Sequence, residues 1–216
     1  MSKVEQLYSE KVDEYVFFVS AFFYPQGLRS FFEGSDFPGS SRRVLDAGCG
    51  TGIVTFALLK ALDRQGYGLE FLHGFDLSPK MLEQFRENLE KKGVENVHLR
   101  EADVLKLADL PPSWSDYDLI VSASMLEYIP KEAFAEVLGG LRSRLSKGGR
   151  LVLFMTRKNW LTKMLIERLW SANRYSKEEL EEAFVAAGFV DITFRRFPLQ
   201  YVWLNLWGHI VEARFE

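Results

Sequence analysis

Val44-Leu45-Asp46-Ala47-Gly48-Cys49-Gly50-Thr51-Gly52 is the stretch of sequence that decides the fold. Apolar and small residues lead into an acid, and three glycines at every second position then open an apolar run from Ile53 to Leu62. This order predicts a buried strand, a tight glycine turn and the start of a helix. A ligand can approach bare backbone at such a turn, so the stretch also predicts a binding site.

The composition favours one globular domain over a membrane, fibrous or disulfide-rich protein. The 216 residues are 47% hydrophobic and 26% charged, and no apolar run is long enough to span a bilayer. Met1 does not lead into a signal-peptide pattern, so we expect a cytoplasmic protein. The single cysteine, Cys49, excludes an internal disulfide and a zinc site built on several thiolates. The net charge of -3 argues against broad nucleic-acid binding and favours a small-molecule partner.

Elements on either side of the glycine turn alternate between strands and helices. Several of the strands are apolar along their whole length, which is typical of a parallel sheet covered on both faces, so we predict an α/β fold. The last two strands are joined by about ten residues without a helix, and we expect them to pair antiparallel. The predicted strands are 43–47, 68–76, 94–101, 117–123, 150–155, 189–197 and 208–215, and the predicted helices are 52–64, 78–92, 130–145, 159–170 and 176–187.

The N-terminal region has the pattern of an amphipathic helix. Apolar residues recur at three- and four-residue steps from Val4 to Phe23, and Pro25 and Gly27 should end the helix. We therefore predict a single domain over residues 1–216. It would consist of an N-terminal helical lid (1–34), a cofactor-binding core (42–156) and C-terminal helices with a strand hairpin (157–216).

Three acids fall at comparable places in the predicted sheet. Asp46 ends the first strand, Asp76 ends the second, and Asp103 follows the third. Ligands of open parallel sheets bind outside the carboxyl ends of the strands, so we expect all three acids to face one crevice. Asp76 could accept hydrogen bonds from ribose hydroxyls and Asp103 from an adenine amine. Each acid alone could equally cap a turn or a helix.

These motifs together resemble those of class I S-adenosylmethionine-dependent methyltransferases of the small-molecule type. The resemblance rests on the glycine stretch and on Phe75–Leu82, Ala102–Val104, Tyr117–Val121 and Gly148–Leu153. It implies a Rossmann-like, doubly wound sheet of seven strands with the last antiparallel. It also implies S-adenosylmethionine as cofactor and S-adenosylhomocysteine as product. The implied cofactor-binding residues are Asp46, Gly48, Cys49, Gly50, Gly52, Asp76, Leu77, Met81, Asp103, Val104 and Ser122.

Other nucleotide-binding motifs fit the glycine stretch less well. A dinucleotide fingerprint, G-x-G-x-x-G, would need glycine where Ile53 stands, and no Gly-Lys-Ser/Thr follows as in a P-loop. The expected reaction is methyl transfer to an oxygen, nitrogen or carbon atom of a partly apolar or aromatic small molecule that remains unidentified. Alternatives are a non-catalytic adenosyl-ligand binding protein or partner subunit, and a nicotinamide-dependent oxidoreductase.

The acceptor site is the part of the chemistry that motifs define least. Glu127 and His209 are candidate general bases, and no metal is expected. We expect the aromatic segment 198–207, the leading helix and the insert 159–170 to cover an apolar acceptor pocket, although aromatic residues at such spacing also serve as core. The predicted pocket residues are Tyr15, Leu126, Tyr128, Tyr201, Trp203 and Trp207.

Overall fold

A computed structural model describes residues 23–36, 43–158 and 173–216 of the chain. Two predicted helices lie outside the described residues. They are the leading helix, which includes Tyr15 and of which only Phe23 is described, and the helix predicted at 159–170. The predicted cofactor-binding core (42–156) is described from residue 43 onward.

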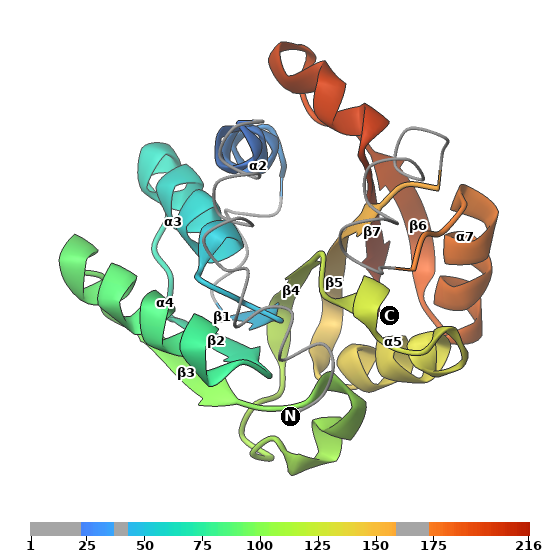
Figure 1. Ribbon diagram of the computed structural model, residues 1–216, viewed down its shortest axis with the longest axis horizontal. Helices are drawn as coiled ribbons and strands as arrows, with labels where there is room; N and C mark the ends of the chain where they lie inside the picture. The colour runs from blue at the N-terminus through green and yellow to red at the C-terminus, as the bar shows by residue number, and fades with distance from the viewer. Residues whose placement is uncertain (1–22, 37–42, 159–172) are drawn as a thin grey trace.

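The described strands form one sheet in the order β3-β2-β1-β4-β5-β7-β6 (Figure 1). Neighbouring strands pair parallel from β3 to β5, whereas β7 pairs antiparallel with both β5 and β6. The predicted doubly wound α/β sheet with an antiparallel last strand is therefore confirmed. The strands are β1 (Arg43–Ala47), β2 (Phe71–Asp76), β3 (Val97–Glu101), β4 (Tyr117–Ala123), β5 (Leu145–Thr156), β6 (Val190–Arg195) and β7 (Gly208–Arg214).

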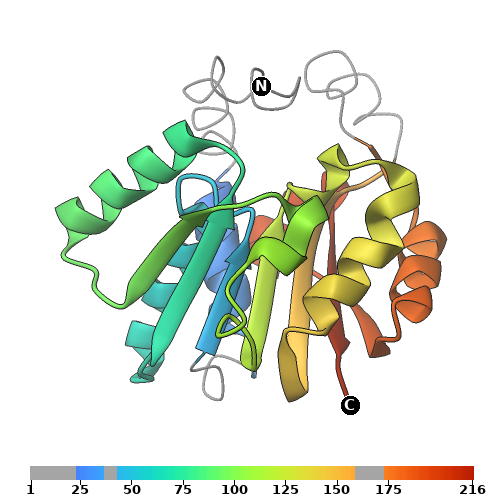
Figure 2. The same cartoon turned by 90° about the horizontal axis from the view of Figure 1, so that it is seen from below.

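Helices cover both faces of this sheet (Figures 1 and 2). One face is covered by α2 (Tyr24–Glu33) and α3 (Ile53–Gln65). The helix α4 (Pro79–Lys92) lies beside α3, and the ring of Phe85 contacts the ring of Phe56 edge-on with the centroids 5.5 Å apart. The other face packs against η1 (Val104–Asp109), α5 (Phe134–Arg142) and α7 (Lys177–Ala186). Short 3-10 helices are η2 (Leu126–Tyr128), η3 (Lys131–Ala133) and η4 (Leu199–Leu206).

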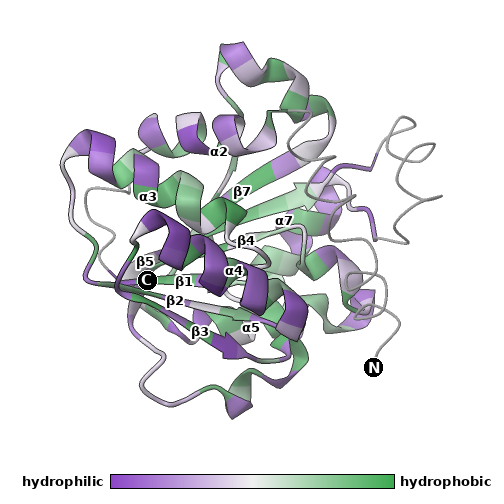
Figure 3. Cartoon of the chain, turned by 60° about the vertical axis from the view of Figure 1, so that its left-hand side comes forward, coloured by the Kyte–Doolittle hydropathy of each residue, from purple (hydrophilic) through white to green (hydrophobic). Residues whose placement is uncertain are grey.

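Alternate residues of the central strands supply the two apolar layers. In β1, Val44 packs into the layer under α2 and α3, whereas Leu45 and Ala47 pack into the layer under α5 and α7. Figure 3 shows largely hydrophobic strands at the centre of the sheet, whereas α4 and the edge strand β3 are mostly hydrophilic. Burial on both faces explains why the central strands carry continuous apolar runs.

Local capping signals in the sequence correspond to real helix ends. The Ser78 hydroxyl accepts a hydrogen bond from the Met81 amide, and Gly93 ends α4 in the left-handed conformation. Ser176 and Glu179 form the predicted capping box at the start of α7. Short polar side chains at these positions satisfy amides that have no partner inside the helix.

Three details differ from the sequence predictions. Pro25 and Gly27 do not end a helix: they lie in the first turns of α2, where proline loses no helical hydrogen bond. The helix predicted at 130–145 is divided into η3 and the shorter α5. The connection between β6 and β7 does contain a helix, η4, with a kink at Tyr201. Within the described residues, no helix is long and apolar enough to cross a membrane.

Candidate functional site

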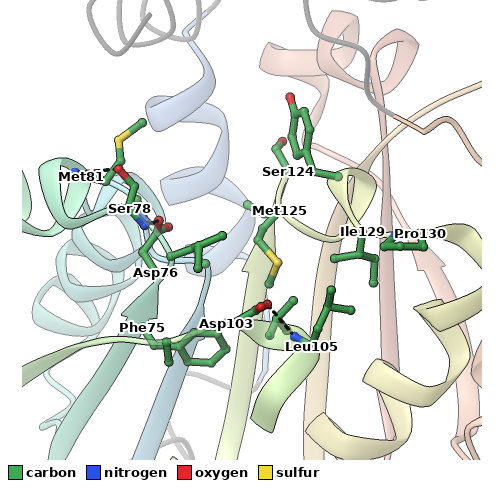
Figure 4. A pocket seen from close by; sticks show the side chains of 17 residues that line it. Phe75, Asp76, Ser78, Met81, Asp103, Leu105, Ser124, Met125, Ile129 and Pro130 are labelled. Atoms are coloured by element: carbon green, nitrogen blue, oxygen red, sulfur yellow. Dashed lines mark hydrogen bonds between the residues drawn. The ribbon is translucent and has the colours of Figure 1, made fainter. Parts of the chain in front are cut away.

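A cavity of ≈ 240 Å³ lies at the carboxyl ends of β1, β2 and β4, where the loops after these strands meet (Figure 4). One side comes from the glycine turn and the start of α4, and the opposite side comes from the loop after β4. Its floor includes the start of η1. The lining residues are Gly48, Gly50, Phe75, Asp76, Leu77, Ser78, Met81, Ala102, Asp103, Val104, Leu105, Ala123, Ser124, Met125, Tyr128, Ile129 and Pro130.

The glycine turn is held over the end of β2. The amides of Gly48 and Cys49 both donate to the Phe75 carbonyl oxygen, at 2.8 and 2.9 Å. Gly50 has a φ of +52°, and no atom of residues 23–36, 43–158 or 173–216 lies within 4 Å of the position that a Cβ would take. Residue 50 therefore needs glycine for its backbone conformation and leaves open space beside the turn.

Asp76 and Asp103 both line the cavity, as predicted, and both also bind backbone amides. The Asp76 carboxylate accepts from the Gly50 amide and from the Ser78 amide, each at 2.9 Å. Asp103 accepts from the Leu105 amide at 2.9 Å through Oδ1. Burial raises the pKa of Asp76, and the donating amides of Ser78, Gly50 and Leu77 oppose that rise. Each carboxylate oxygen can accept more than one hydrogen bond, so both acids keep capacity for a ligand.

Asp46 does not line this cavity, although the sequence predicted that it would face the same crevice as Asp76 and Asp103. Its side chain is 0% exposed and points toward the first turn of α3, where the Thr55 hydroxyl donates to Oδ2 at 2.6 Å. Oδ1 is buried without a hydrogen-bond partner among the described residues. Burial raises the pKa of Asp46 to about 7, with a smaller contribution from Asp76. The alternation of side chains along β1 places this acid beneath the turn rather than in the cavity.

Three other predicted cofactor residues support the cavity from behind it. Cys49 is buried in the cluster that α4 forms, and burial raises the pKa of its thiol. A Cβ at Gly52 would collide with the Phe85 ring. The Ser122 hydroxyl donates to the Ala47 carbonyl oxygen at 2.7 Å and so joins the ends of β4 and β1.

The loop after β4 supplies a largely apolar wall that sequence reasoning identified only in part. Tyr128 lines the cavity as predicted, whereas Leu126 is fully buried in the core. Met125, Ile129 and Pro130 were missed, although they flank Tyr128 in the sequence. Figure 4 shows Met125 reaching toward the middle of the site, and it packs so closely on Gly48 that a Cβ there would overlap its side chain.

Neither predicted general base lines the cavity. Glu127 is 3% exposed, and both of its carboxylate oxygens accept hydrogen bonds from Thr156. Burial raises the pKa of Glu127 to about 7 against the lowering effect of Thr156. His209 lies opposite Met155 on β7 with its ring 5.9 Å from that of Phe194, and burial lowers its pKa. Sequence patterns cannot distinguish the buried position of Glu127 from the cavity position of Tyr128 one residue away.

The aromatic residues of the 198–207 segment also lie away from the cavity lining. Leu204 of η4 packs into the core beside Gly27 of α2. Tyr201 and Trp203 contact each other with ring centroids 5.7 Å apart, and the Trp207 carbonyl accepts from the Arg157 amide. In the part of the chain that is described, no group of three or more His, Cys, Asp or Glu side chains could hold a metal ion.

The sequence comparisons agree with this architecture. A family model described as "Methyltransferase domain" matches residues 38–210. The chain is 30% identical over 171 residues to 2-methyl-6-phytyl-1,4-hydroquinone methyltransferase 2 of Oryza sativa subsp. japonica, which covers 76% of this chain and 43% of that protein. It is 35% identical over 117 residues to the ubiquinone biosynthesis O-methyltransferase of Methylococcus capsulatus, covering 54% of this chain and 44% of the relative. The chain thus spans less than half the length of these two relatives.

The fold recurs in a solved structure described as PigF with SAH. The TM-score is 0.76 at 24% sequence identity, and the match covers 100% of this chain and 62% of that one. The seven-stranded order, the glycine turn and the match over residues 38–210 lead to the same conclusion. The chain belongs to the methyltransferase domain family.

Proposed function

We propose that this protein transfers a methyl group from S-adenosylmethionine to a small, partly apolar aromatic acceptor. The observation that carries the proposal is the cavity beside the glycine turn, with Asp76 and Asp103 on its lining. Asp76 would hold the ribose hydroxyls, and Asp103 would accept from the adenine amine. Met81, Leu77 and Val104 supply apolar contacts around these groups, and Gly48 and Gly50 leave backbone exposed to the rest of the cofactor.

The acceptor class follows from the opposite wall. Met125, Ile129 and Pro130 present apolar surface, and Tyr128 adds a phenol at its edge. One relative is named as a methyltransferase of a hydroquinone and another as an O-methyltransferase of ubiquinone biosynthesis, which supports a hydroquinone or related phenol as acceptor. The cofactor supplies an activated methyl group, and the chain aligns the acceptor for in-line attack and excludes water. We assign no general base, because Glu127 and His209 lie outside the cavity lining.

The test uses purified protein, S-adenosylmethionine with a deuterated methyl group, and a panel of acceptors. The panel contains a prenylated hydroquinone, a catechol, an aromatic amine and a carboxylic acid. We expect labelled product and one equivalent of S-adenosylhomocysteine with the hydroquinone or catechol. Binding of S-adenosylmethionine without turnover of any acceptor would favour a non-catalytic adenosyl-binding protein, and binding of NAD alone would refute the proposal.

A matched pair of variants links turnover to the cavity. Asp103→Asn keeps an oxygen for the Leu105 amide but removes the charge offered to the adenine amine. We expect its dissociation constant for S-adenosylhomocysteine to rise about tenfold or more, as for loss of a charged hydrogen bond. Asp109→Asn changes the exposed last residue of η1, the 3-10 helix that Asp103 caps, and should leave the affinity unchanged.

A further inference from the structure

The loop after β4 is joined to the end of β5 by one buried side chain, Glu127. Its Oε2 accepts from the Thr156 amide at 2.8 Å, and its Oε1 accepts from the Thr156 hydroxyl at 3.0 Å. Both oxygens are therefore directed at one residue of β5 rather than at the cavity. A buried carboxylate is costly unless donors compensate it, so this arrangement holds the loop in one position.

The backbone of the same loop is bonded to residue 173. The Glu127 carbonyl accepts from the Asn173 amide, and the Ile129 carbonyl accepts from the Asn173 side-chain amide, both at 2.7 Å. Glu127, Thr156 and Asn173 are called the Glu127 clamp below. Its bonds join three segments that are distant in the sequence: 124–130, the end of β5, and the residues before α7.

The clamped loop is also the wall of the cavity. Ser124, Met125, Tyr128, Ile129 and Pro130 line the cavity, while the Glu127 side chain lies behind them. Figure 4 shows Met125, Ile129 and Pro130 opposite Asp76 and Met81. A displacement of this loop would therefore move the acceptor wall relative to the cofactor side.

We propose that Glu127 is a positioning residue, which sets the acceptor wall of the cavity through Thr156 and Asn173 without taking part in proton transfer. This inference rests on the proposed function for its catalytic consequence, but the position of the wall can be measured without any acceptor. Misplacement of reacting groups by about 1 Å can lower turnover by about 100-fold, so such a clamp matters for methyl transfer.

Glutamine distinguishes positioning from base catalysis at this site. In Glu127→Gln the amide oxygen can accept from the Thr156 amide, and the NH2 group can donate to the Thr156 hydroxyl oxygen. The clamp is retained, but a carboxamide cannot act as a base. Glu127→Ala removes both bonds, and Thr156→Val removes only the one to the hydroxyl.

The first measurement is hydrogen exchange with S-adenosylhomocysteine bound. The reporters are the Tyr128 amide, which donates to the Met125 carbonyl, and the Asn173 amide. In Glu127→Ala we expect both to exchange at least about tenfold faster, with a smaller change in Thr156→Val and none in Glu127→Gln. Glu212→Gln is the control, because it alters another buried acid that is bonded to Arg150 and Arg195. If exchange at both amides is unchanged in Glu127→Ala and in Thr156→Val, the proposal that Glu127 positions the loop after β4 is refuted.

The second measurement uses the acceptor with the highest turnover in the panel described above. We expect Glu127→Ala to raise the acceptor KM and lower kcat, so that kcat/KM falls about tenfold or more, while the dissociation constant for S-adenosylhomocysteine stays constant. Glu127→Gln should restore the acceptor KM and kcat. Loss of kcat in Glu127→Gln, with exchange still normal, would instead identify Glu127 as a base. Failure of the wild type to bind S-adenosylhomocysteine would refute the proposed function. Hydrogen exchange of the unliganded variants would then still test whether Glu127 positions the loop.

Discussion

Replacing Gly50 by alanine separates the ligand contact of the glycine turn from its backbone conformation. Gly50 has a φ of +52°, where an L-residue costs about 1–2 kcal/mol. Its new methyl group would meet no atom of the described residues within 4 Å, so it adds no steric cost against that part of the chain. Gly50 lines the cavity, and a ligand lying against it would have to move. An overpacked contact costs about 1–3 kcal/mol, which corresponds to a roughly 5- to 150-fold weaker affinity.

Gly66 provides the matched control for this substitution. It ends α3 with a φ of +73°, and among the residues that the structure describes no atom lies within 4 Å of its Cβ position. Urea unfolding should show similar losses of stability, about 1–2 kcal/mol, in Gly50→Ala and Gly66→Ala. Calorimetric titration with S-adenosylhomocysteine should show weaker binding only in Gly50→Ala. Equal affinities in both variants would refute the claim that the cofactor lies against this turn.

Three further changes test the burial of Asp46, the packing of Gly52 and the predicted base His209. Burial raises the pKa of Asp46 from 3.8 to about 7, so the folded protein binds more protons than the unfolded chain between these values, and stability falls as the pH rises through that window. Asp46→Asn should therefore reduce the difference in unfolding free energy between pH 4 and pH 8 by on the order of 4 kcal/mol, as measured by urea unfolding at the two pH values. An unchanged difference would contradict the raised pKa of Asp46. Gly52→Ala combines a φ of +89° with a collision against Phe85 and should lower the unfolding free energy by about 2–4 kcal/mol; a loss below about 1 kcal/mol would show that Phe85 can move aside. His209→Gln should leave kcat and the acceptor KM unchanged in steady-state assays because His209 packs against β6, and a tenfold loss of kcat would restore it as a candidate base.

The sequence predicted the elements whose signals are local. A backbone position with a positive φ favours glycine, free amides at a helix start favour a short polar capping residue, and a strand covered on both faces carries a continuous apolar run. Gly48–Gly52, Ser78, Ser176 and β4 carry such signals, and each lies where its pattern predicts. The short final connection similarly predicted antiparallel pairing of β6 with β7.

The predicted site residues that do not line the cavity are placed by tertiary contacts. Asp46 follows the same strand-end rule as Asp76, but its side chain faces α3 and bonds to Thr55. Glu127 and Tyr128 are adjacent, yet one is fixed to Thr156 and the other lines the cavity. A 3-10 turn directs neighbouring side chains differently, and no period in the sequence reveals which of them enters the site.

The most direct test of the account is a crystal structure of the protein with S-adenosylhomocysteine. We predict density in the cavity of ≈ 240 Å³, with the ribose hydroxyls within hydrogen-bond distance of Asp76 and the adenine amine at Asp103. The tail of the ligand should lie against Gly48 and Gly50. Density for the ligand at another place, or an adenosine group reversed so that neither acid contacts it, would contradict the assignment of this cavity as the cofactor site.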